Sequence, residues 1–231
     1  MATVATARPH RLWSSSVGKK IVMAVSGLIL YGFVVVHMLG NLKVYQGRES
    51  FNHYAEGLRT VGAPFFSPGQ LLWVARAILL AALFVHLAAV VTLTRQSKAA
   101  RKHSYKKYDG LEFSYASRTM LWGGLLVLAY VIYHLMHFTF GNVHPNFVPG
   151  DVYSNFVRGF QQWPVSLAYV VAMIPLGLHM YHGFWSMLQT LGANNPKYNR
   201  VRRPIALVLA LGVVLINMSF PIAVLLGFVK L

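Results

Sequence analysis

The chain has 231 residues, of which 56% are hydrophobic and 11% are charged, and it carries 21 Lys and Arg against 5 Asp and Glu. This composition is too apolar for a soluble domain of this size and predicts an integral membrane protein. The absence of cysteine excludes a disulfide, an iron–sulfur cluster held by this chain, and covalent haem attachment through a Cys-x-x-Cys-His motif.

Five windows of about 20 mostly apolar residues, the length that crosses a bilayer, occur along the chain. They predict membrane-spanning helices near residues 20–42, 71–94, 119–141, 164–191 and 204–229. The connections are too short for a soluble domain, so we expect residues 1–231 to form one all-α domain, a five-helix transmembrane bundle. No cleavage site follows the first window, which should therefore stay in the mature protein.

The positive charges indicate an orientation. Most Lys and Arg residues lie in the N-terminal tail and in the second and fourth connections, which share one side of such a bundle. The positive-inside rule predicts a cytoplasmic N-terminus, an outer C-terminus and a multi-pass protein of the cytoplasmic (inner) membrane. The basic side would dock a soluble partner subunit, although topology and anionic lipid explain it equally well. No nucleic acid is expected, because no recognition motif accompanies the cations.

Histidine recurs inside four of the five predicted helices. The positions are His37, His86, the pair His134 and His137, and the pair His179 and His182. A lone intramembrane histidine is more often a hydrogen-bonded core residue than a ligand. The recurrence favours metal ligation, and a proton relay is disfavoured because all five acidic residues lie in connections. The sequence therefore predicts bound haem with histidine ligands.

Depth in the bilayer sorts these histidines into two levels. At about 1.5 Å of rise per residue, His37 and His134 lie roughly 23 to 25 Å from the inner edge of the membrane. His86 and His179 lie roughly 12 and 18 Å from that edge. Two levels, each with histidines from two helices, are what two stacked bis-histidine b-type haems require. Depth alone does not separate the two members of either histidine pair.

Five segments of the sequence resemble one known family. They are SGLILYGFVVVHMLGNL at 26–42, SFNHYAEGLR at 50–59, LFVHLAAV at 83–90, YHLMHF at 133–138 and LHMYHGFWSMLQTLG at 178–192. Nearly the whole chain is similar to the cytochrome b membrane-anchor subunit of succinate dehydrogenase and fumarate reductase, in its single-chain, five-helix, two-haem form. The HGFWSMLQTLG segment is the most specific part of this resemblance.

The resemblance implies one haem ligand on each of the first four membrane helices. Matched by motif, the ligands are His37 and His134 for the iron of the outer, distal haem b, and His86 and His179 for that of the inner, proximal haem b. The remaining histidines, His137 and His182, would then lie next to the ligands or be their alternatives.

The resemblance further implies electron transfer in respiratory complex II, an enzyme of the tricarboxylic acid cycle. A flavoprotein and an iron–sulfur subunit on the cytoplasmic side would exchange electrons between succinate or fumarate and the proximal haem. The distal haem would connect to membrane quinone, which is typically menaquinone in two-haem members. This chain would not itself perform the dicarboxylate chemistry, and its sequence does not determine the physiological direction.

Three glycines bear on these expectations. Some fumarate reductases of the family carry a glutamate for transmembrane proton movement two residues before the fourth-helix ligand, where this chain has Gly177. A proton path of that design is therefore not expected. Gly123 and Gly124 would let a neighbouring helix or a haem edge approach closely.

Four polar residues are candidates for contacts to haem. We expect Arg76 to pair with the propionates of the distal haem and Arg118 with those of the proximal haem. Ser26 and Tyr31 would add hydroxyl groups. Snorkelling of Arg76 to the headgroups, a topology signal at Arg118, and helix packing of the two hydroxyl residues are the alternatives.

A quinone site is expected in the outer connection. His53, Tyr54 and Glu56 would supply hydrogen bonds and a proton to a quinone there. An ordinary amphipathic surface turn uses the same residues and is the favoured alternative.

Two other functions remain open. A di-haem anchor of a quinone-linked hydrogenase or formate dehydrogenase would share the histidine pattern, although HGFWSMLQTLG and FNHYAEGLR argue against it. A haem-free transporter would line a polar path with these histidines and would be colourless.

Overall fold

The computed structural model describes residues 13–100 and 115–231, without the side chains of residues 115–118, 197 and 198. All regular structure in this part of the chain is helical. The elements are α1 (Ser16–Asn41), the 3-10 segment η1 (Leu42–Gln46), α2 (Arg48–Thr60), α3 (Gln70–Ala99), α4 (Tyr115–His134), the π-helical segment η2 (Leu135–Thr139), α5 (Val152–Gln161), α6 (Trp163–Thr190) and α7 (Pro196–Leu225).

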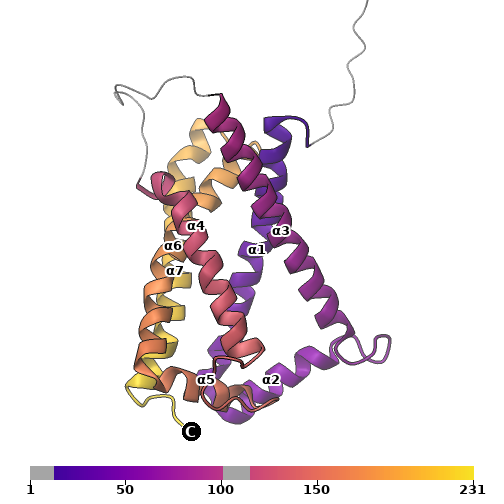
Figure 1. Ribbon diagram of the computed structural model, residues 1–231, viewed down its shortest axis with the longest axis vertical. Coiled ribbons are helices and arrows are strands. Elements are labelled where there is room, and N and C mark those ends of the chain that lie inside the picture. The colour runs from indigo at the N-terminus through magenta and orange to yellow at the C-terminus, as the bar shows by residue number, and fades with distance from the viewer. Residues whose placement is uncertain (1–12, 101–114) are drawn as a thin grey trace, which may run out of the picture.

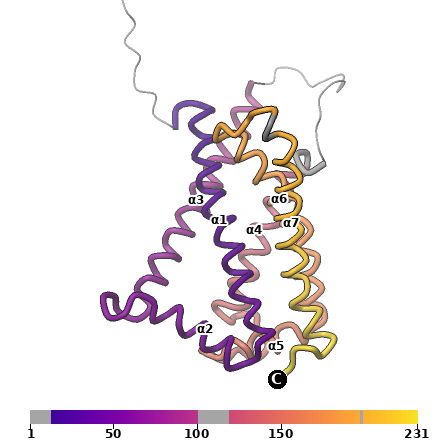
Figure 2. The backbone as a smooth tube through the Cα atoms, turned by 180° about the vertical axis from the view of Figure 1, so that it is seen from behind, coloured from indigo at the N-terminus to yellow at the C-terminus, as the bar shows by residue number. Residues whose placement is uncertain are grey.

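The prediction of five membrane-spanning helices is confirmed. Within the described residues, α1 with η1, α3, α4 with η2, α6 and α7 are long and apolar enough to cross a bilayer, so the chain is a multi-pass membrane protein. The start of α1 and the C-terminus lie at opposite ends of the bundle (Figures 1 and 2). We call the end with the starts of α1, α4 and α7 the basic end, and the other the α2–α5 end.

The predicted helix boundaries were too short at the basic end. Arg95 and Lys98, assigned to a connection, lie in the last turns of α3, and Arg200 and Arg202 lie in the first turns of α7. A helix of 30 residues is about 45 Å long, which exceeds a hydrocarbon core of about 30 Å. The charged turns therefore extend past the apolar windows from which the boundaries were read.

Two short helices were missed. The SFNHYAEGLR segment lies in α2, a helix of 13 residues rather than a surface turn, and α5 was not predicted at all. Gly47, with φ 92° and ψ 177°, precedes α2, and the side chain of Asp151 caps α5 by accepting a hydrogen bond from Ser154 N at 3.1 Å. Both helices lie across the same end of the bundle (Figure 1).

Helix α6 organises the bundle. It packs against α7, α4 and α1, while α3 packs mainly on α1 and leans away from the other spans toward the α2–α5 end (Figures 1 and 2). The best-buried cluster lies at that end, where aromatic side chains of α2, α5, α6 and α7 meet. Its members include Phe51, Phe156, Phe160, Tyr169 and Phe220.

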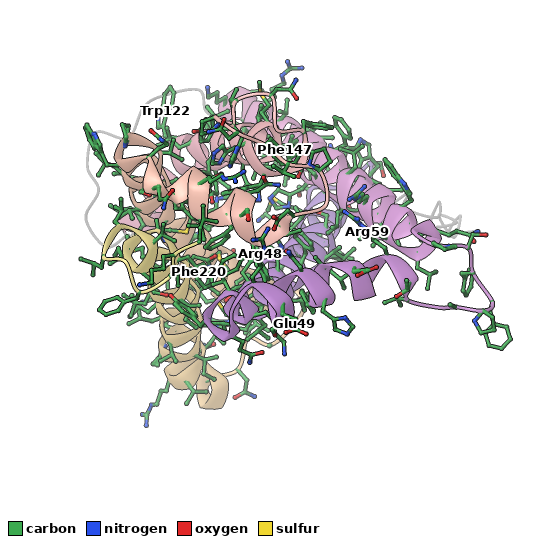
Figure 3. The ribbon with its side chains drawn as sticks, turned by 90° about the horizontal axis from the view of Figure 1, so that it is seen from below. Arg48, Glu49, Arg59, Trp122, Phe147 and Phe220 are labelled. Carbon is green, nitrogen blue, oxygen red and sulfur yellow. The ribbon has the colours of Figure 1, made fainter. Side chains whose placement is uncertain are left out.

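A polar contact joins α2 to α5. Arg48 pairs with the carboxylate of Asp151, and Asn52 Nδ2 donates to the same carboxylate at 3.0 Å. Asn52 also accepts a hydrogen bond from the backbone nitrogen of Tyr153 at 2.9 Å. Seen from the α2–α5 end, Arg48 lies on the side of α2 that faces α5, and Glu49 lies on the opposite side (Figure 3).

Acid should weaken this contact. Burial acts to raise the pKa of Asp151, but hydrogen bonds from Asn52, Ser154 and Arg48 outweigh it and lower the pKa from 3.8 to about 2. The stabilisation is therefore complete above about pH 4 and is lost as the pH falls through about 2. Thermal unfolding measured between these pH values should show a drop that Asp151→Asn lacks. An equal drop in both proteins would contradict the assignment.

Candidate functional site

Four histidines form two pairs inside the bundle. The ring centroids of His37 on α1 and His134 on α4 lie 5.8 Å apart, with the ring planes at 84°. Those of His86 on α3 and His179 on α6 lie 6.3 Å apart, with the planes at 64°. The first pair lies toward the α2–α5 end and the second toward the basic end. Depth predicted the same pairing of helices, α1 with α4 and α3 with α6, but left the choice between His134 and His137 and between His179 and His182 open.

The spacing of each pair suits two axial ligands of one metal ion. With metal–nitrogen bonds of about 2 Å, imidazoles on opposite sides of an ion hold their centroids about 6 Å apart. Within the described residues no group of three or more His, Asp or Glu side chains converges on a metal position. Two imidazoles at this spacing could hold the iron of a haem, whose macrocycle would supply the remaining donors.

Hydrogen bonds orient two of the four rings. His86 Nδ1 lies 3.2 Å from the carbonyl oxygen of Met23 and 3.3 Å from Ser26 Oγ. His134 Nδ1 lies 3.3 Å from the hydroxyl of Tyr169. A proton on Nδ1 leaves Nε2 as the ligating nitrogen, which is the usual arrangement of metal-bound histidine. His179 Nδ1 is buried and has no hydrogen-bond partner.

The structure distinguishes His134 from His137. The chain changes from α-helix to the wider π-helical turn directly after His134, and the two rings differ in burial and in their neighbours. His137 is 0% exposed, stacks on Tyr133, and hydrogen-bonds Tyr169 through Nδ1 at 3.1 Å. A Cβ on Gly159 would lie 2.9 Å from its ring, so the space around His137 is closed.

His182 likewise differs from His179. Its ring contacts Trp185, with centroids 4.9 Å apart, whereas the ring of His179 faces His86. His37 is exposed, His137 is buried, and His86, His134, His179 and His182 are all half-buried, so ring contacts and not exposure distinguish His179 from His182.

Glycines bring the helices close to the ligand candidates. A Cβ on Gly27 would lie 3.3 Å from His86 Cε1, and one on Gly124 would lie 3.5 Å from His179 Cε1. Gly123 faces the backbone of α6 at Pro175, where a Cβ would lie 4.0 Å from the carbonyl oxygen. Of the two uses foreseen for Gly123 and Gly124, the structure shows the close approach of a helix.

A cleft of about 230 Å³ opens between α4 and α6 beside His179. Its other walls are largely apolar and include Leu126, Ile174 and Leu178. An apolar wall next to a single imidazole suits the flat hydrocarbon face of a macrocycle.

The candidates for propionate contacts are dispersed. Arg76 is exposed and its guanidinium lies over the ring of Trp73, 4.8 Å from the centroid, as a snorkelling arginine would. The side chain of Arg118 lies outside the described residues. Ser26 contacts His86, and the hydroxyl of Tyr31 is buried without a hydrogen-bond partner.

The three quinone candidates do not converge. His53 and Glu56 are exposed on α2. Tyr54 turns toward the bundle, and its hydroxyl occupies the space that a side chain at Gly40 would need. Only Tyr54 of these three therefore faces the membrane helices.

Gly177 lies against α7. A Cβ at this position would come within 2.6 Å of Val214 Cγ2. The Cβ of a glutamate at this position, where some members of the resembled family have one, would also clash with Val214.

We expect Gly177→Ala to destabilise the bundle by about 1 to 3 kcal/mol, because the added methyl group overpacks the contact between α6 and α7. Gly183→Ala on the same helix is the matched control, since nothing lies within 4 Å of its Cβ position. That change should stabilise the helix by up to about 1 kcal/mol. Thermal unfolding in detergent compares the two. Adding Val214→Ala should restore part of the loss in Gly177→Ala, and no recovery would contradict the contact.

Comparisons with known proteins do not assign a family. No family model matches the chain, and neither a curated protein nor a solved structure does.

Proposed function

We propose that this chain is the membrane-anchor cytochrome b subunit of a succinate:quinone oxidoreductase and holds two bis-histidine haems b. The observation that carries the proposal is the pairing of four intramembrane histidines, with ring centroids 5.8 and 6.3 Å apart at two levels of one bundle. The motifs that resemble the family's cytochrome b subunit support the same function. The enzyme class rests on those motifs, because the histidine geometry alone is common to di-haem anchors.

The chain's own residues would hold and orient the cofactors. His37 and His134 would ligate the distal haem, and His86 and His179 the proximal haem. When bound there, haem supplies reversible one-electron transfer. Met23 and Ser26 fix the ring of His86, and Tyr169 fixes that of His134, so that each Nε2 is presented for ligation.

The two ends of the bundle would serve different partners. The basic end exposes Lys20, Arg95 and Lys98, which suits docking of the proposed flavoprotein and iron–sulfur subunits. Menaquinone is the proposed electron partner at the α2–α5 end. There Tyr54 is the hydroxyl that faces the bundle and would donate a hydrogen bond to a quinone carbonyl.

In the proposed orientation the protein spans the cytoplasmic (inner) membrane of the cell, and its basic end faces the cytoplasm. Helix α6 contains no Asp or Glu, and Gly177 stands where some members of the resembled family have a glutamate. Proton movement through a glutamate of this helix is therefore not part of the proposal. The direction of the dicarboxylate reaction would follow from the potentials of the quinone and of the partner subunits.

A redox titration of the purified full chain tests the proposal. We expect a reduced-minus-oxidised b-type spectrum with two components of different potential, and co-purification of a flavoprotein from the native membrane. A colourless chain would contain no haem. That result would reject the proposal and favour the alternative of a transporter whose histidines line a polar path. Two b-type components with a hydrogenase or formate dehydrogenase as partner would retain the haems but reject the enzyme class.

A further inference from the structure

Three buried nitrogen atoms gather where α6 ends and α7 begins, and none of them has a hydrogen-bond partner among the described residues. They are His182 Nδ1 and Trp185 Nε1 on α6 and Arg202 Nε on α7. The rings of His182 and Trp185 are in contact, with centroids 4.9 Å apart. The guanidinium of Arg202 lies 5.8 Å from the centroid of Trp185, so the three side chains form one cluster.

The turn between the two helices makes this cluster. Gly192, with φ 96°, ends α6, and the backbone nitrogen of Ala193 bonds the carbonyl oxygen of Leu188 at 2.9 Å. The chain therefore reverses within a few residues, and the start of α7 lies beside the end of α6 (Figure 1). Arg202 Nη1 donates to the carbonyl oxygen of Ala193 at 3.0 Å, which holds the guanidinium over the turn.

Arg202 is a buried charge without a described counter-ion. It is only 8% exposed, and within the described residues its hydrogen-bond partner is a neutral carbonyl. The acidic residues in the described part of the chain are Glu49, Glu56 and Asp151, which lie on α2 or at the start of α5, at the other end of the bundle. A buried guanidinium is costly unless an anion pairs with it, and the nearby indole N–H is a second donor.

We propose that His182, Trp185 and Arg202 form an anion-binding site at the basic end of the bundle, for a carboxylate or phosphate group presented from the membrane. The Nε–H groups of Arg202 and Trp185 would donate to its oxygens, and His182 would donate through Nδ1. The guanidinium of Arg203, 5.2 Å from the centroid of Trp185, adds a second positive charge.

Two kinds of molecule could place a phosphate or carboxylate group at this end of the bundle. One is an anionic phospholipid, whose phosphate lies at the membrane surface near the helix ends. The other is a haem ligated by His179, because His182 and Trp185 follow that residue by one and two turns, about 4.5 and 9 Å along α6. The haem source rests on the proposed function, whereas the lipid source does not.

The first measurement uses the full chain in nanodiscs of phosphatidylglycerol or phosphatidylcholine, followed by native mass spectrometry in detergent. If the anion is a lipid phosphate, the wild-type chain should retain phosphatidylglycerol in preference to phosphatidylcholine. Arg202→Gln should weaken this retention by about tenfold or more, since a hydrogen bond to a charged group is lost. Arg200→Gln is the matched control, because it removes the same charge from an exposed position on the same helix.

The second measurement is the midpoint potential of the two b-type components in the same proteins. If the anion is a haem carboxylate, Arg202→Gln should lower the potential of the component that His86 and His179 hold. The reason is that an uncompensated negative charge favours the oxidised iron. Arg200→Gln should leave this potential close to the wild-type value, and lipid retention should be equal in both variants.

Trp185→Phe keeps a ring in the contact and removes only the N–H donor, so it tests the site if Arg202→Gln fails to fold. It should weaken lipid retention or change the potential in the same direction as Arg202→Gln. The proposal is wrong if neither property separates Arg202→Gln and Trp185→Phe from Arg200→Gln. A chain without b-type absorption would reject the proposed function and the haem source, and lipid retention would then decide the site alone.

Discussion

Replacing His179 by alanine should abolish one of the two b-type components proposed for this chain and leave the other at its wild-type potential. His86→Ala should remove the same component, because the two rings face each other on α3 and α6 at 6.3 Å. His37→Ala and His134→Ala should both remove the second component instead. Each haem would be held by two histidines, so we expect removal of one of them to cause loss of that haem rather than a small shift in potential. The measurement is the haem content and redox titration of each purified variant.

The neighbouring histidines provide the controls for this experiment. His182→Gln and His137→Gln should retain both components, since the ring of His182 packs on Trp185 and His137 is fully buried beside Tyr133. The test depends on which of the two components each variant loses. Loss of the same component in His37→Ala and His86→Ala would contradict the pairing, and loss only in the His137 or His182 variants would show that the wrong member of each pair was chosen.

Tyr169→Phe should raise the midpoint potential of the component that His37 and His134 are proposed to hold. The hydroxyl of Tyr169 lies 3.3 Å from His134 Nδ1 and 3.1 Å from His137 Nδ1. If His134 ligates iron through Nε2, its Nδ1–H donates to the tyrosine oxygen, and the tyrosine O–H in turn donates to His137. Accepting this hydrogen bond makes His134 a stronger ligand and favours the oxidised iron.

The expected rise is about 20 to 60 mV, which corresponds to a hydrogen bond of about 0.5 to 1.5 kcal/mol in a one-electron couple. Tyr130→Phe is the matched control. The ring centroid of Tyr130 lies 5.3 Å from that of Tyr169 and 5.9 Å from that of His134, but Tyr130 makes no described hydrogen bond to either residue. The component held by His86 and His179 should stay unchanged in both variants. A fall in potential, or an equal shift in Tyr130→Phe, would contradict the role of the Tyr169 hydroxyl.

Much of the fold follows from local patterns in the sequence. A bilayer requires about 20 apolar residues per helix, so the five spans could be counted before any contact was known. The positions of His37, His86, His134 and His179 along their spans set the depth of each one. Because the direction of a span alternates from one helix to the next, depth predicted which helices would bring their histidines together.

Other features depend on contacts between distant segments. Helices α2 and α5 are short and amphipathic, and they are held by each other through Arg48, Asn52 and Asp151 and by the aromatic cluster beneath them. Isolated helices of 10 or 13 residues are marginal in water, so no local pattern marks them clearly. The three quinone candidates on α2 were close in sequence, but a helix points neighbouring side chains in different directions.

The sequence by itself determined that this is a membrane protein with five spans and with histidines at two depths, because hydropathy and helical rise are properties of single segments. Depth did not distinguish His134 from His137 or His179 from His182. Only the tertiary structure shows that the rings of His134 and His179 are the ones that lie beside His37 and His86. His137 is fully buried in the π-helical turn that follows His134, and the ring of His182 packs against Trp185. Side-chain direction at a helix junction depends on what packs against it, and that packing comes from residues far away in the chain.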